Sequence, residues 1–107
     1  MADFTINEMQ EMQRALQEKY KDRWEPISPE TGQNKLLWMI GEVGEVIDII
    51  KNGGPQASAD AALRKDLVEE LADVLMYYND VLLCYGISAA ELKEAYTAKF
   101  KRNLKRW

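Results

Sequence analysis

Two pairs of acidic residues have a spacing that suits metal binding. Glu42 and Glu45 lie in the stretch WMIGEVGEVIDIIK, and Glu70 and Asp73 lie in LVEELADVLMYYNDVL. Residues three apart on a helix project from the same face, so each pair presents two carboxylates side by side. Two acids about 4 Å apart repel by roughly 4 kcal/mol at an effective dielectric constant near 20. If the two helices pack antiparallel, four carboxylates converge, and a divalent cation would offset their repulsion.

The chemistry of these ligands favours particular metals. Carboxylate oxygens without histidine or thiolate select hard cations, so we expect Mg²⁺, with Mn²⁺ as an alternative. Either acid pair alone is more typical of a solvated helix face. The occurrence of both pairs in helices rich in Val, Ile and Leu favours the metal site. Gly41 and Gly44 each destabilise a helix interior by about 1 kcal/mol relative to alanine, and they predict the close approach of another helix or of a ligand.

A basic stripe follows near the end of the chain. Lys99, Asn103 and Arg106 are spaced four and three residues apart, so they share one face of the last predicted helix. Such a stripe suits the phosphates of a nucleotide, and Arg106 could make a bidentate contact. The alternative is a basic final turn that complements the helix dipole.

Candidates for contacts to a nucleobase lie beside the acids. Trp38 precedes Glu42 by one turn, and Tyr77 and Asp80 continue the face of Glu70 and Asp73. Asn79 could hydrogen-bond a base edge if the helix is slightly rotated. Aromatic residues on a helix are more often part of the core, which is the alternative for this group.

The elements that must position these residues are all predicted to be helices. Capping boxes begin the first helix at Thr5-Ile-Asn-Glu8 and the last at Ser88-Ala-Ala-Glu91. The first helix extends to about residue 22, and a loop with two prolines follows. The second covers about 33–51 and is stopped by Asn52-Gly-Gly-Pro55. The third begins between 58 and 61 and ends at Tyr85, before Gly86. The pattern predicts an all-α fold.

The composition excludes several classes of protein. The 107 residues form one domain, 1–107, of ordinary globular composition. The absence of histidine excludes Cys/His zinc sites, serine–histidine catalysis and Glu-x-x-His di-iron motifs. A net charge of −4 argues against binding to nucleic acid polymers, and no apolar run is long enough to span a membrane. The start MADFTINEMQ lacks the regions of a signal peptide and Cys84 has no cysteine partner, so we expect a cytoplasmic protein.

These motifs resemble those of the MazG-like, all-α nucleoside triphosphate pyrophosphohydrolases. The resemblance rests on Glu42-x-x-Glu45 followed by Glu70-x-x-Asp73, on GEVGEV and ELADVLMYY around them, and on the final pattern K-x-x-x-N-x-x-R-W. It covers the chain from about Phe4 to Trp107. One departure is Gly41, because many members have a second glutamate directly before the first motif.

The resemblance implies a fold and an activity. The implied fold is a four-helix antiparallel bundle completed by oligomerisation, as a homodimer or homotetramer. The implied activity is Mg²⁺-dependent hydrolysis of nucleoside triphosphates to monophosphates and pyrophosphate, which would clean the nucleotide pool. Glu42, Glu45, Glu70 and Asp73 would be the metal ligands and catalytic residues.

Three alternatives remain at this point. The first is a phosphoribosyl-ATP pyrophosphatase, which uses similar acidic helices on a different nucleotide. The second is a non-enzymatic helical oligomerisation module with a structural cation. The third, a ferritin-like di-iron protein, is disfavoured by the absence of histidine.

Overall fold

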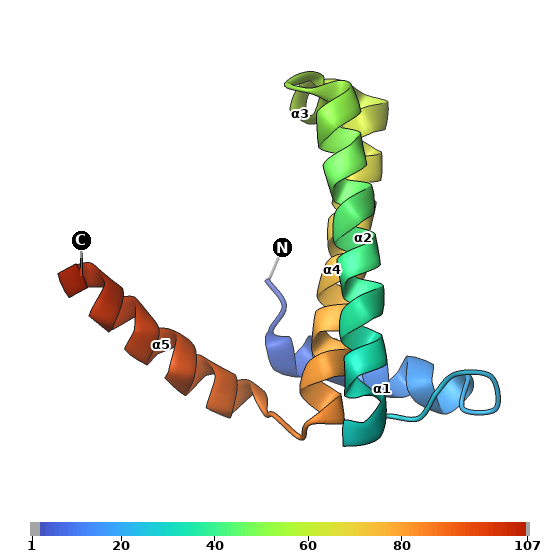
Figure 1. Cartoon of the computed structure of the whole chain (residues 1–107), viewed down its shortest axis with the longest axis vertical. Coiled ribbons are helices and arrows are strands. Elements are labelled where there is room, and N and C mark those ends of the chain that lie inside the picture. The colour runs from blue at the N-terminus through green and yellow to red at the C-terminus, as the bar shows by residue number, and fades with distance from the viewer. Residues whose placement is uncertain (1–2, 107) are drawn as a thin grey trace.

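Helices make up nearly all of the chain, as the sequence predicts. The structure, a computed structural model, describes residues 3–106. Within these residues it contains five α-helices, one 3-10 helix and no strand (Figure 1). The elements in chain order are α1 (Ile6–Lys19), η1 (Pro29–Thr31), α2 (Gly32–Gly53), α3 (Gln56–Ala59), α4 (Ala61–Cys84) and α5 (Ala89–Arg106). The all-α prediction is confirmed, and the short helix α3 is an addition to the four expected helices.

Side-chain caps fix where the helices begin. The Thr5 hydroxyl accepts a hydrogen bond from Glu8 N, and the Glu8 carboxylate accepts one from Thr5 N, which completes the predicted capping box. Asp60 caps α4 by accepting from the backbone N–H groups of Ala62 and Leu63. The Ser88 hydroxyl accepts from Glu91 N at the start of α5. These contacts satisfy N–H groups that the first helical turn leaves unpaired.

The long helices α2 and α4 form an antiparallel hairpin that is the centre of the molecule (Figure 1). Gly54, with a φ of 55°, ends α2 in a left-handed conformation that glycine adopts without strain. Helix α3 then connects the two long helices. At the opposite end of the hairpin, the buried Gly32 lies against the ring of Tyr85, where a Cβ atom would clash. The hairpin therefore brings the two acid-bearing helices together along their length.

Helix α1 packs across one end of the hairpin through polar side chains. Its three buried residues are Gln10, Gln13 and Gln17. Gln10 Nε2 donates to the carbonyl of Ile87 at 3.1 Å, and Gln13 Nε2 donates to Asp80 Oδ1 at 2.9 Å. Because buried amides need partners, these hydrogen bonds fix how α1 sits against the end of α4.

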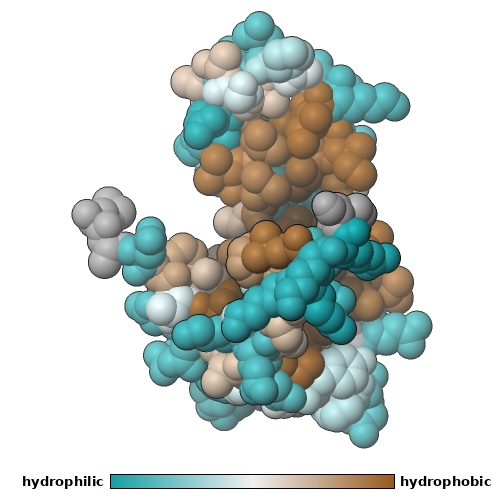
Figure 2. Space-filling model, turned by 90° about the vertical axis from the view of Figure 1, so that its left-hand side faces the viewer, coloured by the Kyte–Doolittle hydropathy of each residue, from teal (hydrophilic) through white to brown (hydrophobic). Residues whose placement is uncertain are grey.

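Few apolar side chains are buried in this arrangement. The buried apolar residues in 3–106 are Val46, Ala57, Leu82 and Cys84. The Cα radius of gyration is 16.2 Å, against about 13 Å for a compact domain of this length. Helix α5 extends away from the hairpin and buries none of its residues (Figure 1). Apolar side chains gather instead on the surface of the upper part of the hairpin (Figure 2). The chain thus exposes helix faces that are suited to further packing.

No helix within residues 3–106 has both the length and the hydropathy that crossing a bilayer requires.

Candidate active site

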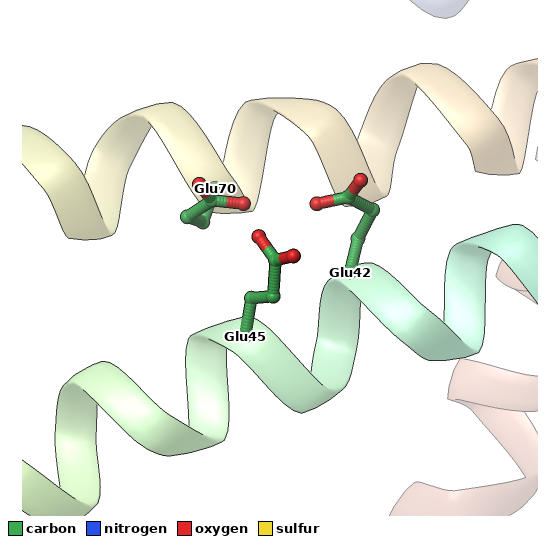
Figure 3. Close-up of side chains that lie close together, drawn as sticks. All are labelled: Glu42, Glu45 and Glu70. Atoms are coloured by element: carbon green, nitrogen blue, oxygen red, sulfur yellow. The ribbon is translucent and has the colours of Figure 1, made fainter.

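Three of the four predicted acidic ligands meet between α2 and α4. Glu42 and Glu45 project from α2, and Glu70 projects from α4 toward them (Figure 3). One carboxylate oxygen from each lies within 4.8 Å of the others. None of these acids forms an ion pair with a lysine or arginine within residues 3–106. We call this group the acid cluster.

The antiparallel packing explains why these residues meet. When two antiparallel helices carry side chains at the same spacing, those side chains can face each other at successive positions along the pair. Glu42 and Glu45 are three residues apart on α2, and Glu70 and Asp73 are three apart on α4. Both pairs therefore point to the shared groove between the helices rather than to opposite faces.

Crowding of negative charge changes the acidity of the acid cluster. The pKa of Glu45 is raised above its usual 4.5, first by a shared hydrogen bond with Glu70 and then by the charges around it. The pKa of Glu70 is also raised, first by the proton that it would share with the nearby Glu42 carboxylate and then by partial desolvation. A raised pKa means that the ionised cluster is electrostatically unfavourable without a cation.

The donor atoms fit a hard divalent cation. All three ligands are carboxylates, and Glu42 Oε2 and Glu70 Oε2 are buried without a hydrogen-bond partner within the described residues. Buried oxygens without a partner are unfavourable unless a cation or water satisfies them. The acid cluster could therefore hold a cation such as Mg²⁺ or Mn²⁺.

Asp73 lies next to the acid cluster without joining it. It is absent from the group whose oxygens come within 4.8 Å of one another. Its charge nevertheless raises the pKa values of Glu45, Glu70 and Tyr77. Asp73 also lines a neighbouring pocket, so it lies between the acid cluster and that pocket.

The pocket beside Asp73 has a volume of about 440 Å³. Its walls come from α1, from the loop that follows it, and from α2 and α4. The lining residues are Gln13, Leu16, Arg23, Trp24, Glu25, Asn34, Lys35, Trp38, Asp73, Met76, Tyr77 and Asp80. Three of the four residues expected to contact a base are thus brought together here, with two tryptophans and a tyrosine among the walls. We call this cavity the aromatic pocket.

Comparison with protein families identifies the architecture. A model of the MazG nucleotide pyrophosphohydrolase domain matches residues 30–106, which is most of the chain. The chain belongs to the MazG family. No curated protein and no solved structure matched the chain. The match includes both acid pairs of the MazG domain and leaves out α1, although Gln13 and Leu16 of α1 line the aromatic pocket.

The fourth residue predicted to contact a base lies outside the aromatic pocket. Asn79 of the MazG domain is buried, and its amide donates to the carbonyl of Leu75 at 2.9 Å and to the sulfur of Met9 at 3.5 Å. It lines a separate apolar groove between α1 and α4. Asn79 therefore lines the apolar groove, whereas Asp80, which Gln13 of α1 contacts, lines the aromatic pocket.

The three residues predicted to bind phosphate are not near the acid cluster in this chain. Lys99, Asn103 and Arg106 are exposed on α5, which extends away from the α2–α4 hairpin (Figure 1). Trp107, the last residue of the motif that the MazG resemblance used, lies outside the described residues. Within one subunit, α5 and the acid cluster are separate.

Two buried polar residues of the pocket were missed by the sequence analysis. Lys35 is 7% exposed and Gln13 is 4% exposed, and both line the aromatic pocket. Lys35 could have been found from its position, because it precedes Glu42 by seven residues and so lies on the same helix face. Gln13 had no such signal, since its role depends on how α1 crosses the hairpin.

The glycines around Glu42 have open space beside them. A Cβ atom added at Gly41 or Gly44 would meet no atom of another element in the described residues within 4 Å. The predicted close approach at these glycines is therefore not made by another helix of the same chain.

Proposed function

We propose that this protein is a Mg²⁺-dependent nucleoside triphosphate pyrophosphohydrolase. In the proposed reaction, water attacks the α-phosphorus, the bond from that phosphorus to the bridging oxygen breaks, and pyrophosphate leaves. The observation that supports this most is the meeting of Glu42, Glu45 and Glu70 within 4.8 Å, beside an aromatic pocket of about 440 Å³. A cation site next to a base-sized pocket is the arrangement that a nucleotide requires.

The acids have a defined part in this proposal. Glu42, Glu45 and Glu70 would hold the cation, and Asp73, whose charge acts on Glu45 and Glu70, would be the fourth ligand. Bound there, a divalent cation would neutralise phosphate oxygens and make a bound water more acidic. A carboxylate of the acid cluster would accept the proton of the attacking water.

The aromatic pocket receives the base in this proposal. Trp38 and Tyr77 can stack on a planar ring, and Asp80 can accept hydrogen bonds from its edge. Asp73 lies between the pocket and the acid cluster, so a base in the pocket would leave its phosphates near the cation. Substrates of this kind are free nucleotides of the cytoplasmic pool, and removal of unwanted nucleotides is the proposed role.

Oligomerisation is the second part of the proposal. Tyr96, Phe100 and Leu104 recur every four residues on α5 and are 75%, 55% and 68% exposed. An amphipathic helix without a packing partner is suited to dock on another subunit. In a homodimer or homotetramer, α5 would bury these side chains and bring Lys99, Asn103 and Arg106 to the phosphates. Light scattering that reports a monomer at micromolar concentration would contradict this part.

The activity itself is tested by incubating the purified protein with each common ribo- and deoxyribonucleoside triphosphate and measuring pyrophosphate. We expect release in Mg²⁺ that stops in EDTA and falls more than about 100-fold in Glu42→Gln. Glu69→Gln is the matched control, because Glu69 is an exposed acid beside Glu70. Full activity in Glu42→Gln would refute the assigned site.

The same assay separates the alternatives. Turnover of phosphoribosyl-ATP with none of the common triphosphates would indicate the related pyrophosphatase. Absence of all turnover, together with stabilisation by Mg²⁺, would favour the non-enzymatic oligomerisation module.

A further inference from the structure

The aromatic pocket contains two buried side chains of opposite charge. Lys35 is 7% exposed and Asp80 is 3% exposed, and both line the pocket. Burying a charged group is costly unless it is paired or hydrogen-bonded. The ionic state of these two groups therefore bears on what the pocket binds.

Neither charge is fully satisfied by the protein. Within residues 3–106, Lys35 has no carboxylate oxygen within 4.0 Å of its ammonium and donates no hydrogen bond. Asp80 Oδ1 accepts from Gln13 Nε2 at 2.9 Å, and the side-chain amide of Gln17 also lies near the Asp80 carboxylate, so only part of its accepting capacity is left for a ligand. A buried donor and a buried acceptor thus border one cavity with unused capacity.

The charge of Lys35 affects the pKa of Asp80, although the two side chains form no ion pair within the described part of the chain. Burial raises the pKa of Asp80, while the Gln13 hydrogen bond, the Lys35 charge and the amide of Gln17 lower it. Lys35 therefore acts on Asp80 without pairing with it directly. A ligand that accepts a hydrogen bond from Lys35 and donates one to Asp80 would satisfy the hydrogen-bonding capacity of both groups.

The aromatic walls and the charged groups of the pocket together suit a ligand that is a flat ring with a polar edge. Trp24, Trp38 and Tyr77 line the pocket with aromatic rings, and aromatic rings can stack on any nucleobase. Discrimination among bases must then come from the edge. A carboxylate only accepts hydrogen bonds and an ammonium only donates them, so these two groups restrict the bases that fit.

Only guanine offers two adjacent donors next to an acceptor. Its N1–H and N2–H₂ groups can both face one carboxylate, and its O6 lies beside them. Adenine and cytosine offer one amino donor to Asp80 and a ring-nitrogen acceptor to Lys35, so each donates one fewer hydrogen bond to the carboxylate than guanine does. Uracil and thymine flank their single N–H with two carbonyl oxygens, with the same result.

We propose that the aromatic pocket selects guanine nucleoside triphosphates, with Asp80 accepting from N1–H and N2–H₂ and Lys35 donating to O6. Gln13 is a positioning residue that holds the Asp80 carboxylate. This assignment rests on the proposed function, because it names the substrate class of the same site.

Binding and turnover are measured separately so that the two proposals can fail independently. Tryptophan fluorescence or calorimetry gives the affinities of the α,β-imido analogues of GTP, ATP, CTP and UTP, in which the reacting bond is blocked. We expect guanine to bind at least about fivefold more tightly than each other base. Equal affinities would overturn the guanine assignment alone. Absence of pyrophosphate release from any triphosphate would overturn the hydrolase proposal, and the affinities would still decide the base.

Two comparisons test the proposed contacts. The inosine analogue lacks the 2-amino group, so wild-type protein should bind it several-fold more weakly than guanine, and equal binding would overturn the paired contact. Asp80→Asn keeps the size and the acceptor for Gln13 but loses the charge, and it should reduce the preference for guanine to within about twofold. Asp66→Asn, an exposed acid on the same helix, should keep the preference. A retained preference in folded Asp80→Asn would refute the role of Asp80.

Discussion

The α2–α4 hairpin has charged side chains at two levels along its length, the acid cluster and the aromatic pocket. The first contains charges of one sign, and the second contains charges of both signs. At the acid cluster, Glu42, Glu45 and Glu70 have the same charge, and the pKa values of Glu45 and Glu70 are raised. At the aromatic pocket, burial raises the pKa of Asp80, and the opposite charge of Lys35 offsets part of that rise. Seven residues separate Lys35 from Glu42 on one helix, so the same two helices support both arrangements.

The difference indicates which ligand each level accepts. The acid cluster favours a cation, because its carboxylates have the same charge and two of their buried oxygens lack a hydrogen-bond partner among the described residues. Added positive charge would reduce the repulsion. Opposite charges set apart across a cavity favour a neutral ring with donors and acceptors on its edge. A nucleotide complexed with a divalent cation supplies both ligands in one molecule.

The largest expected effect comes from introducing a positive charge into the acid cluster, so that it contains opposite charges as the aromatic pocket does. In Glu70→Lys, an ammonium would lie beside Glu42 and Glu45 and substitute for a cation. We expect pyrophosphate release to fall more than about 100-fold, because a metal ligand is lost. In EDTA, the melting temperature should rise, because the repulsion is offset. Retained activity, or a lower melting temperature in EDTA, would contradict the contrast between the two levels.

A smaller effect is expected from removing a hydrogen bond at the aromatic pocket. Gln13→Leu removes the hydrogen bond to Asp80 Oδ1 and leaves a buried carboxylate without it. We expect the free energy of unfolding to fall by about 1–3 kcal/mol, measured by urea denaturation. Gln33→Leu, which alters an exposed glutamine, should change it by less than about 0.5 kcal/mol. Equal effects in the two variants would show that the Gln13 contact is unimportant for stability.

The smallest effect is the pH dependence of the metal-free acid cluster. The folded protein holds protons on Glu45 and Glu70 more tightly than the unfolded chain, because their pKa values are raised above 4.5. Stability in EDTA should therefore decrease as pH rises from 4.5 through the raised values. The decrease is modest because the cluster is open to solvent, which screens the charges. Melting curves should show a weaker decrease in Glu70→Gln and an unchanged one in Glu69→Gln, whereas identical slopes in all three proteins would contradict the shifts.

Much of the fold follows from local signals in the sequence. The capping boxes at Thr5 and Ser88 and the glycines at 54 and 86 determine helix ends through contacts within a few residues. The acid pairs could be placed on one groove because their spacing is a property of the helix itself. These features need no knowledge of how distant helices pack.

Other features depend on packing between distant elements. The buried glutamines of α1 were unexpected, because an amide becomes buried only when a partner such as Ile87 or Asp80 meets it. Asn79 and Asp80 are neighbours in the sequence and both contact α1, yet Asn79 lines the apolar groove and Asp80 lines the aromatic pocket. The position of α5 could not be inferred either, since its apolar face finds no partner within the described chain.

Cation binding by the acid cluster is tested most directly by titrating Mn²⁺ into the protein and following free Mn²⁺ by electron paramagnetic resonance. The account predicts that wild-type protein and Glu69→Gln bind Mn²⁺, that Mg²⁺ competes, and that Glu42→Gln and Glu70→Gln lose at least about tenfold in affinity. Unchanged Mn²⁺ affinity in folded Glu42→Gln and Glu70→Gln would contradict it.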